Sequence, residues 1–347
     1  MGSSKKERIS LKILGLLLLS LIGSLAVVRT DESESLEKDD FGSVILVIGA
    51  AGEEQYDDLF EAWSRQWETG AIGGGKALYL VGPNSLDSET SVLSELEEII
   101  NKQDRKSLHE LWVIFLGHGQ YDGRKGKFNL VGPDLAADQL KDWLSDFERP
   151  LVLSFCFSAS APFLAELARP GVTIVSATKS GNENNFSRFG RYFAASIGDL
   201  SADLDKDGQV SVLEAFLMGS RRLEEYYLEE GLLATEHPIL DDNGDGKGVG
   251  ADWFKGVRPE KQATDGSLVD GARAKQIHLM ATSLEQRMPV AMRVKRDELE
   301  IAIEKLYGRK AGMEKSDYLK ALERLLVEIA ELYKKADALA NQGTQED

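Results

Sequence analysis

The sequence predicts an α/β fold in which helices flank a mostly parallel sheet. Apolar runs of strand length, such as residues 43–49 and 111–116, recur between residues 43 and 177. Segments with helical periodicity separate these runs, and this alternation is typical of βαβ units. Because the strands are apolar along their whole length, we expect both faces of the sheet to be covered.

The predicted elements follow one another without long gaps. Residues 43–49 form the first strand, and residues 54–68 form an amphipathic helix in which apolar side chains recur at intervals of three and four. The other strands are predicted at 76–81, 111–116, 151–155 and 172–177, and the other helices at 88–101, 136–147, 189–198 and 212–229.

The pattern changes after residue 250. A polar connection over 251–271 precedes helical stretches at 272–284, 292–306 and 315–339. The last stretch carries one apolar stripe, as a packed helix does. We expect residues 272–340 to form a helical hairpin that packs on the body or on a partner protein, followed by a tail over 341–347.

Residues 1–28 are typical of an export signal. Basic residues between positions 5 and 12 precede the apolar run 13–22, and small residues follow at Ser24 and Ala26. An uncleaved segment would serve as a membrane anchor, although the run is short for a spanning helix. Either alternative exports the body, with residues 29–40 as an acidic linker to the fold at residues 41–250.

Composition excludes one class of partner and raises a question about the thiol. The chain carries 41 basic and 58 acidic residues, a net charge of -17. Such a charge repels polyphosphate, so nucleic-acid binding is not expected. The single cysteine cannot form an intramolecular disulfide, and an unpaired thiol in an oxidising compartment needs a chemical reason.

Two reactive side chains stand at the ends of predicted strands. His118 follows the strand 111–116 between two glycines, and Cys156 follows the strand 151–155. Carboxyl ends of parallel strands share one edge of a sheet, so if these two strands are neighbours the imidazole can generate the thiolate and later protonate a leaving amine. Taken singly, Cys156 reads as a small buried hydrophobe and His118 as a hydrogen-bonded histidine. Their occurrence at equivalent strand ends favours chemistry.

These residues resemble a known family. Gly117-His118-Gly119 and Cys156-x-Ser158-Ala159-Ser160 look like the motifs of legumain-like cysteine peptidases in the caspase clan, and the resemblance covers residues 41–198. It implies a caspase-like fold, with His118 as general base, Cys156 as nucleophile, and the amides of Gly119 and Cys156 as oxyanion hole. It also implies that one wall of the specificity pocket is formed by Ser176, Ala177 and Thr178.

Three departures limit what the resemblance implies. Legumains carry an arginine-histidine pair after the first strand, where this chain has Glu53-Glu54-Gln55. Ser154 replaces an acidic residue before the cysteine, and Gln120 replaces a serine after the His-Gly pair. Specificity for asparagine is therefore not transferred.

Residues 203–214 match a calcium loop of the EF-hand type. Oxygen donors fill each required position of the twelve, and Gly208 stands where the loop must turn sharply. We expect this loop to bind Ca²⁺ in a structural role. The expected ligands are Asp203, Asp205, Asp207, the Gln209 carbonyl, Ser211 and Glu214.

A second acidic loop, residues 241–252, matches the same pattern less completely. The shorter Asp252 replaces the final glutamate, and no amphipathic helix leads into the loop. Binding and non-binding both remain open for this loop. Its ligands would be Asp241, Asn243, Asp245 and Asp252.

Two classes of function remain open. The first is a cysteine endopeptidase acting on a peptide or protein through an acyl-thioenzyme, or a transamidase that uses the same acylation. The second is a calcium-binding scaffold on a catalytically silent caspase-like fold, whose C-terminal helices recruit a partner protein.

Overall fold

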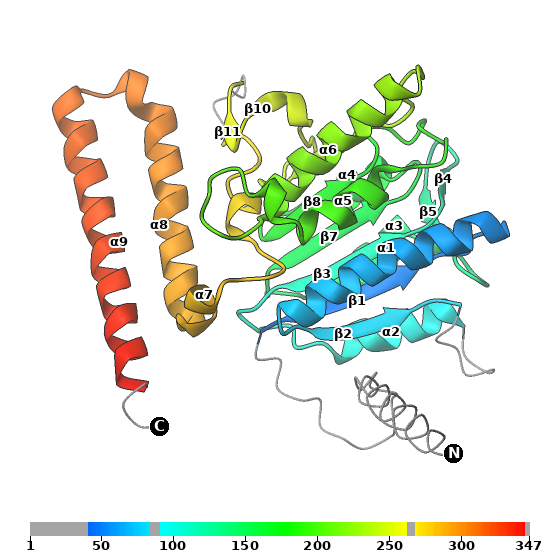
Figure 1. Cartoon of the computed structure of the whole chain (residues 1–347), viewed down its shortest axis with the longest axis horizontal. Helices are drawn as coiled ribbons and strands as arrows, with labels where there is room; N and C mark the ends of the chain where they lie inside the picture. The colour runs from blue at the N-terminus through cyan, green and yellow to red at the C-terminus, as the bar shows by residue number, and fades with distance from the viewer. Residues whose placement is uncertain (1–40, 84–90, 262–267, 344–347) are drawn as a thin grey trace, which may run out of the picture. The chain divides into compact units, whose positions relative to one another are not determined.

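The central feature is a six-stranded sheet with the order β2-β1-β3-β7-β8-β9 (Figure 1). The computed structural model describes residues 41–83, 91–261 and 268–343. All neighbouring strands pair in parallel except β8 and β9, which are antiparallel. The mostly parallel sheet predicted from the sequence is confirmed. Its strands are β1 (Ser43–Ile48), β2 (Ala77–Val81), β3 (Leu111–Leu116), β7 (Leu151–Cys156), β8 (Val172–Ser176) and β9 (Ile239–Asp241).

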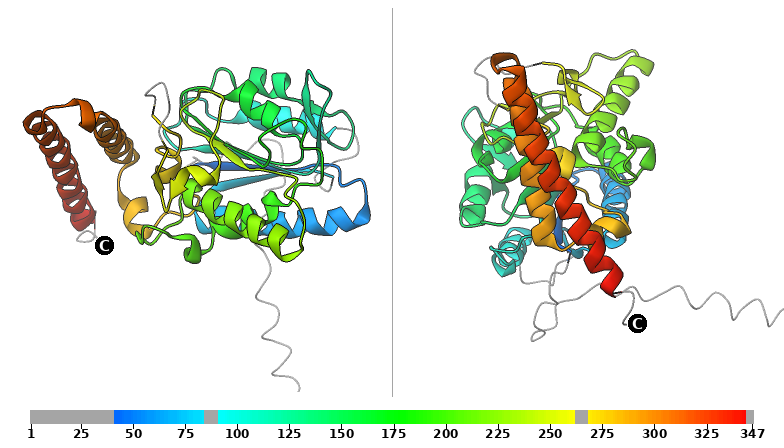
Figure 2. Two further views of the ribbon diagram at one scale, coloured as in Figure 1. Left: turned by 90° about the horizontal axis from the view of Figure 1, so that it is seen from above. Right: turned by 90° about the vertical axis from the view of Figure 1, so that its left-hand side faces the viewer.

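Helices cover both faces of the sheet, in two layers that Figure 2 shows from above. Alternate strand residues point to opposite faces, and each set is buried against its own helices. One face packs on α1 (Glu54–Gly73), α5 (Phe189–Ile197) and α6 (Val212–Glu229). The other packs on α2 (Val92–Lys102), α3 (Ala137–Leu144) and α4 (Ala161–Leu167).

A small antiparallel sheet follows β3 at the carboxyl edge. Its strands pair in the order β4-β5-β6 and were not anticipated from the sequence. They are only two or three residues long, too short for periodicity to reveal them. The strands are β4 (Gly119–Tyr121), β5 (Gly126–Phe128) and β6 (Leu135–Ala136).

The region from 272 to 284 differs from the sequence-based expectation of a helix. It contains only the 3-10 turn η3 (Ala274–Gln276) and the start of the five-residue helix α7 (Ser283–Arg287). Between η3 and α7, His278 pairs with Ser211 in an isolated β-bridge, and the carbonyl of Ile277 accepts from the amide of Val212 at 2.9 Å. Contacts with the loop of residues 203–214, called the calcium-type loop below, therefore hold this segment extended. The helix was predicted in error because the periodicity of a segment does not show its contacts with distant residues.

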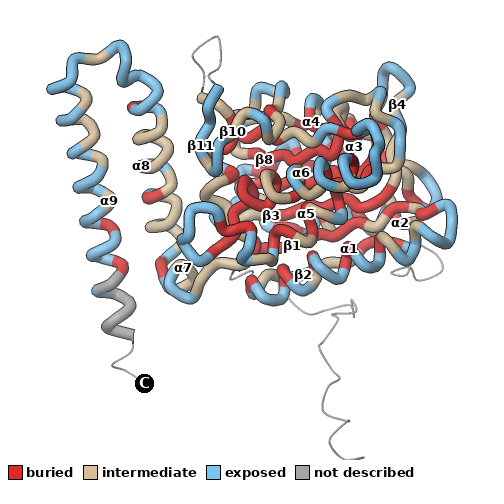
Figure 3. Tube along the Cα trace, turned by 45° about the horizontal axis from the view of Figure 1, so that its top comes forward, coloured by how far each residue is buried: buried red, intermediate tan, exposed pale blue. Residues whose placement is uncertain are grey.

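Two long helices follow, α8 (Val290–Arg309) and α9 (Lys315–Gly343), which contact one another. Most of α9 is exposed, whereas the strands β3, β7 and β8 in the middle of the sheet are buried (Figure 3). The connection from α5 to α6 contains η1 (Leu200–Ala202). Between β9 and η3 lie η2 (Ala251–Trp253), β10 (Phe254–Lys255) and β11 (Arg258–Pro259).

The predicted export segment, residues 1–28, and the linker, residues 29–40, lie outside the described residues. Across the described helices, none combines the length and the hydropathy that a membrane crossing requires.

Candidate active site

The sheet register places the two predicted catalytic residues at one edge and on one face. Leu116 of β3 pairs with Cys156 of β7, so both strands end at the same level. Leu116 and Cys156 belong to the core cluster that faces α1 and α5. Two residues beyond Leu116, His118 contacts Phe60 of α1 and therefore lies on that face as well. The structure thus brings the imidazole and the thiol to adjacent strand ends.

His118 is oriented by a backbone carbonyl. Its Nε2 lies 3.2 Å from the oxygen of Ala51, which can only accept, so Nε2 carries the proton and Nδ1 is the basic nitrogen. Burial lowers the pKa of His118, while the Ala51 hydrogen bond and the charge of Glu53 oppose that shift. Sequence reasoning missed Ala51, since a carbonyl that orients a side chain leaves no mark in residue type.

Cys156 is wholly buried. A methyl group built on Gly190, in the first turn of α5, would lie 2.8 Å from the Cβ of Cys156 and 3.3 Å from the ring of Trp63. Only glycine therefore allows α5 to approach the thiol this closely. Burial raises the pKa of Cys156, and the negative charge of Glu236 raises it further. In this state the thiol is protonated at neutral pH.

The loop after Cys156 is tied to the loop after His118. The hydroxyl of Ser158 accepts from the amide of Gly119 at 3.3 Å and donates to its carbonyl at 3.1 Å. Ala159 has a φ of 55°, in the left-handed region that favours glycine, which matches the Gly/Ala position of the motif. The predicted oxyanion-hole amide of Gly119 is thus paired with Ser158 here, and its catalytic role stays a prediction.

The predicted specificity wall is buried. Ser176, Ala177 and Thr178 are all inaccessible to solvent. Ser160 joins the two hydroxyls, at 2.8 Å from Ser176 Oγ and 3.1 Å from Thr178 Oγ1, which fixes the start of α4 to the end of β8. Their assignment to substrate contact stays a prediction.

The segment between β8 and α5 is held by Glu236, a residue that was not singled out from the sequence. Glu236 is buried and accepts from the hydroxyl of Ser187 at 2.6 Å and from the amide of Phe189 at 3.1 Å. Burial raises its pKa. Glu236 lies far from this segment in sequence, so only the fold reveals that its carboxylate caps α5 beside the thiol.

The first acidic loop brings together three of its four predicted carboxylate ligands. Oxygens of Asp203, Asp205 and Glu214 lie within 4.8 Å of one another, the only such group among the described residues. Burial and the negative charges of its neighbours raise the pKa of Asp205, as expected where a cation would relieve repulsion. The donor set is all oxygen, which suits Ca²⁺.

Within this loop, both Glu214 oxygens accept backbone N–H groups, from Leu204 at 2.7 Å and Ser211 at 2.9 Å. Gly208 has a φ of 89° at the sharp turn. Ser211 and Glu214 form a capping box that starts α6. The predicted ligand Asp207 is not part of that carboxylate group and accepts instead from the amide of Gln209 at 2.8 Å. The side-chain Oε1 of Gln209 accepts from the amide of Thr282 at 2.9 Å.

The second acidic loop begins as the first does, where Asp203 accepts from the amides of Lys206 and Gly208, and it differs at its last ligand position. Asp241 accepts from the amides of Gly244 and Gly246, and Asn243 accepts from the amide of Asp245. The carboxylate of Asp252 pairs instead with Lys261. Metal binding by this loop stays a prediction.

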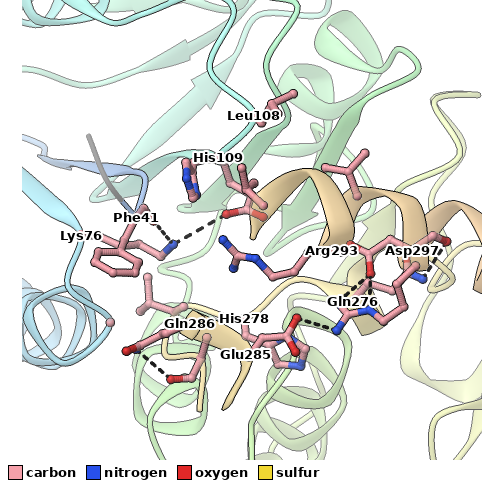
Figure 4. Close-up of a pocket in the computed structure, with 17 residues that line it drawn as sticks. Phe41, Lys76, Leu108, His109, Gln276, His278, Glu285, Gln286, Arg293 and Asp297 are labelled. Carbon is pink, nitrogen blue, oxygen red and sulfur yellow. Dashed lines mark hydrogen bonds and ion pairs between the residues drawn. The ribbon is translucent and has the colours of Figure 1, made fainter. Parts of the chain in front are cut away.

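A separate pocket lies at the amino edge of the sheet, against α8 (Figure 4). Lys76 donates to the carbonyl of Phe41 at 2.8 Å and lies 3.7 Å from the Glu110 carboxylate. His118 and Cys156 are at the opposite strand ends, so this pocket is not part of their site. Its lining also includes His109, Gln276, His278, Arg293 and Asp297.

Comparison with known proteins gives only distant structural similarity. No family model and no curated protein matches the chain. The Drosophila initiator caspase Dronc is 12% identical, with a TM-score of 0.39, over 62% of this chain and 85% of that one. Caspase-1 from Spodoptera frugiperda is 11% identical (TM-score 0.38; 63% and 93%). Raptor from Chaetomium thermophilum is 10% identical (TM-score 0.38; 81% and 35%).

Two of these neighbours are caspases. At identities of 10–12% and TM-scores below 0.5, the likeness is too distant to indicate an activity.

Proposed function

We propose that the chain is a cysteine endopeptidase that acts on peptides or proteins. The observation that carries this proposal is the placement of His118 and Cys156 at adjacent carboxyl ends of β3 and β7, on one face of the sheet. The Ala51 carbonyl supports it, because it leaves Nδ1 of His118 as a base.

The proposed reaction has two halves. The thiol proton passes to His118 as sulfur attacks the substrate carbonyl carbon, so that a C–S bond forms. The C–N bond then breaks, and the imidazolium returns its proton to the leaving amine. Water hydrolyses the thioester and restores the thiol. An amine acceptor in place of water would give transamidation.

A second candidate, a catalytically silent scaffold, has its own supporting observation. Cys156 is inaccessible, and burial raises its pKa, so the described state is not poised for attack. The two functions differ in whether Cys156 ever reacts.

The discriminating experiment is covalent labelling with peptidyl acyloxymethyl ketones, with calcium and with chelator. A peptidase forms one adduct per chain, at Cys156, and the adduct requires His118. Labelling that is absent from wild type and from Cys156→Ala alike would favour the scaffold.

We also propose that residues 203–214 bind one Ca²⁺ as a structural ion, with Asp203, Asp205 and Glu214 at the centre of the donor set. The ion would remove repulsion between carboxylates and brace the start of α6. A further part of the proposal is export through residues 1–28. Mass spectrometry of the protein from its native host, which reads the mature N-terminus, tests whether that segment is cleaved.

A further inference from the structure

Phe186 lies in a pocket made of aromatic rings beside the proposed base. Its ring centroid is 4.6 Å from that of Tyr56, 5.9 Å from Trp63 and 5.7 Å from the imidazole of His118. Tyr56 in turn meets His118 edge-on at 4.8 Å. One wall of the pocket that holds Phe186 is therefore the imidazole itself.

The rings form an inner and an outer layer. Phe60 and Trp63 are 1% and 3% exposed and form the floor, whereas Tyr56, His118 and Phe186 are partly exposed. Trp63 lies against Gly190, next to the thiol. Phe186 thus packs on the outer side of the aromatic floor, and Trp63 of that floor lies beside Cys156 at Gly190.

The chain around Phe186 is anchored on both sides, and between the anchors Phe186 is held through Arg188, which donates to its carbonyl at 3.5 Å and lies over its ring. On one side, the carbonyl of Glu183 accepts from the amide of Ala159 at 2.8 Å. On the other, Ser187 is held by Glu236. Asn184 and Asn185 are exposed and make no hydrogen bond in the described part of the chain. A short stretch between two anchors can swing a ring outward without breaking either anchor.

We propose that Phe186 occupies the pocket for the substrate side chain next to the attacked carbonyl, and that this pocket selects an aromatic or large apolar residue. The proposal rests on the proposed peptidase function. A side chain one bond away from the reacting carbonyl must lie close to the base, as Phe186 does. The rings of Tyr56, Phe60 and Trp63 offer flat apolar surface. The Arg188 guanidinium lies 5.5 Å over the Phe186 ring, a cation–π contact that an aromatic substrate side chain in the same place would also receive.

In the resting protein Phe186 then acts as a plug, and a substrate competes with it for the same surface. The apparent affinity for a substrate is then the intrinsic affinity multiplied by the fraction of molecules in which Phe186 has left the pocket. Removing the ring should therefore both expose the thiol and strengthen binding of apolar substrates.

The first test uses the single cysteine as its own reporter. Alkylation by iodoacetamide, followed by intact mass, should be about tenfold or more faster in Phe186→Ala than in wild type, because the open fraction rises. Asn185→Ala, one residue away and exposed, is the matched control and should alkylate at the wild-type rate. Circular dichroism establishes that both variants are folded. Equal rates in Phe186→Ala and wild type would overturn the plug.

The second test addresses selectivity without requiring catalysis. N-acetyl-phenylalanine amide should protect Cys156 of Phe186→Ala from alkylation, whereas the arginine and aspartate amides should not. A peptide series that varies the residue before the scissile bond should show the same preference in kcat/KM. Hydrolysis that favours a charged residue would overturn the apolar pocket and leave the peptidase intact. Selective protection by the phenylalanine amide without hydrolysis of any peptide would support the pocket and overturn the peptidase.

Discussion

At the scale of single residues, burial sets the protonation of the proposed catalytic pair. Desolvation raises the pKa of the Cys156 thiol and lowers that of the His118 imidazole, so both shifts favour the neutral forms. An ion pair would need stronger mutual stabilisation or partial opening of the site. A buried thiol in its neutral form also resists oxidation.

The first prediction concerns the pH dependence of thiol reactivity. A folded-state pKa above the usual thiol value means that the thiolate of Cys156 appears only at higher pH than in the unfolded chain. Alkylation of unfolded protein in guanidinium should rise with a midpoint at about 8.5. Alkylation of the folded protein should rise only above that pH. Coincident midpoints would contradict burial of the thiol.

The second prediction is that Cys156→Ala abolishes peptide hydrolysis and covalent labelling while the protein stays folded. Ser154→Ala is its matched control, on the same strand and the same face. The Ser154 hydroxyl is buried without a hydrogen-bond partner among the described residues, so its removal should leave labelling unchanged. It should also leave stability unchanged or raise it by about 1 kcal/mol, since an orphaned polar group is lost. Full activity in Cys156→Ala would refute the assignment.

The third prediction separates the two histidines that flank β3. His118→Ala removes the proposed proton acceptor, so acylation should slow by about two to four orders of magnitude. His109 precedes the strand at the opposite edge of the sheet, and His109→Ala should retain the wild-type rate. Acylation is measured by the burst of amine released from a peptide amide. A rate for His118→Ala within about threefold of wild type would mean that another base operates.

At the scale of elements, residues 203–214 join three parts of the chain. The loop ends in the capping box of α6, and its Gln209 side chain accepts from the amide of Thr282. The β-bridge between Ser211 and His278 runs alongside. A cation bound here would therefore stabilise α6 and the extended segment before α7 together.

The fourth prediction is that calcium raises the melting temperature and that Glu214→Gln greatly reduces this rise. Binding to the folded state alone stabilises by about 2.7 kcal/mol at a hundredfold excess over the dissociation constant. The variant loses one charge and the bidentate carboxylate. Glu229→Gln, exposed at the other end of α6, should respond as wild type does. Melting curves with calcium and with chelator give the comparison, and equal responses in all three proteins would exclude this loop.

At the scale of the whole molecule, a polar joint connects the body to the C-terminal helices. Arg296 of α8 is largely buried, with its Nη1 2.5 Å from the carboxylate of Glu285 in α7 and its Nη2 2.7 Å from the carboxylate of Asp297. Gln276 of η3 donates to Glu300 of α8 at 2.9 Å. This joint holds α8 against the segment that the calcium-type loop keeps extended.

The fifth prediction is that Arg296→Ala loosens this joint. Removal of one partner leaves the Glu285 and Asp297 carboxylates uncompensated, a loss of about 3–5 kcal/mol for a buried pair. Limited proteolysis should cut near α7 faster than in wild type. Arg287→Ala, exposed on α7, is the control and should be cut at the wild-type rate. An unchanged digestion pattern in Arg296→Ala would show that apolar contacts alone hold α8.

The sequence by itself determined the parallel sheet, because uninterrupted apolar strands such as β3 can only be buried on both faces. It also placed His118 and Cys156 at the carboxyl ends of strands, whereas the pairing of β3 with β7 was decided by the fold. The helix 212–229 was likewise predicted, directly after the loop of the EF-hand type.

Only the tertiary structure decided what surrounds those residues. The Ala51 carbonyl on His118, Glu236 at the start of α5 and the ring of Phe186 are contacts between segments far apart in the chain. The segment 272–284 was misread as a helix for the same reason, since its hydrogen bonds go to residues near 211. Periodicity records which side of an element is buried, whereas the partner it meets is fixed only when the chain folds.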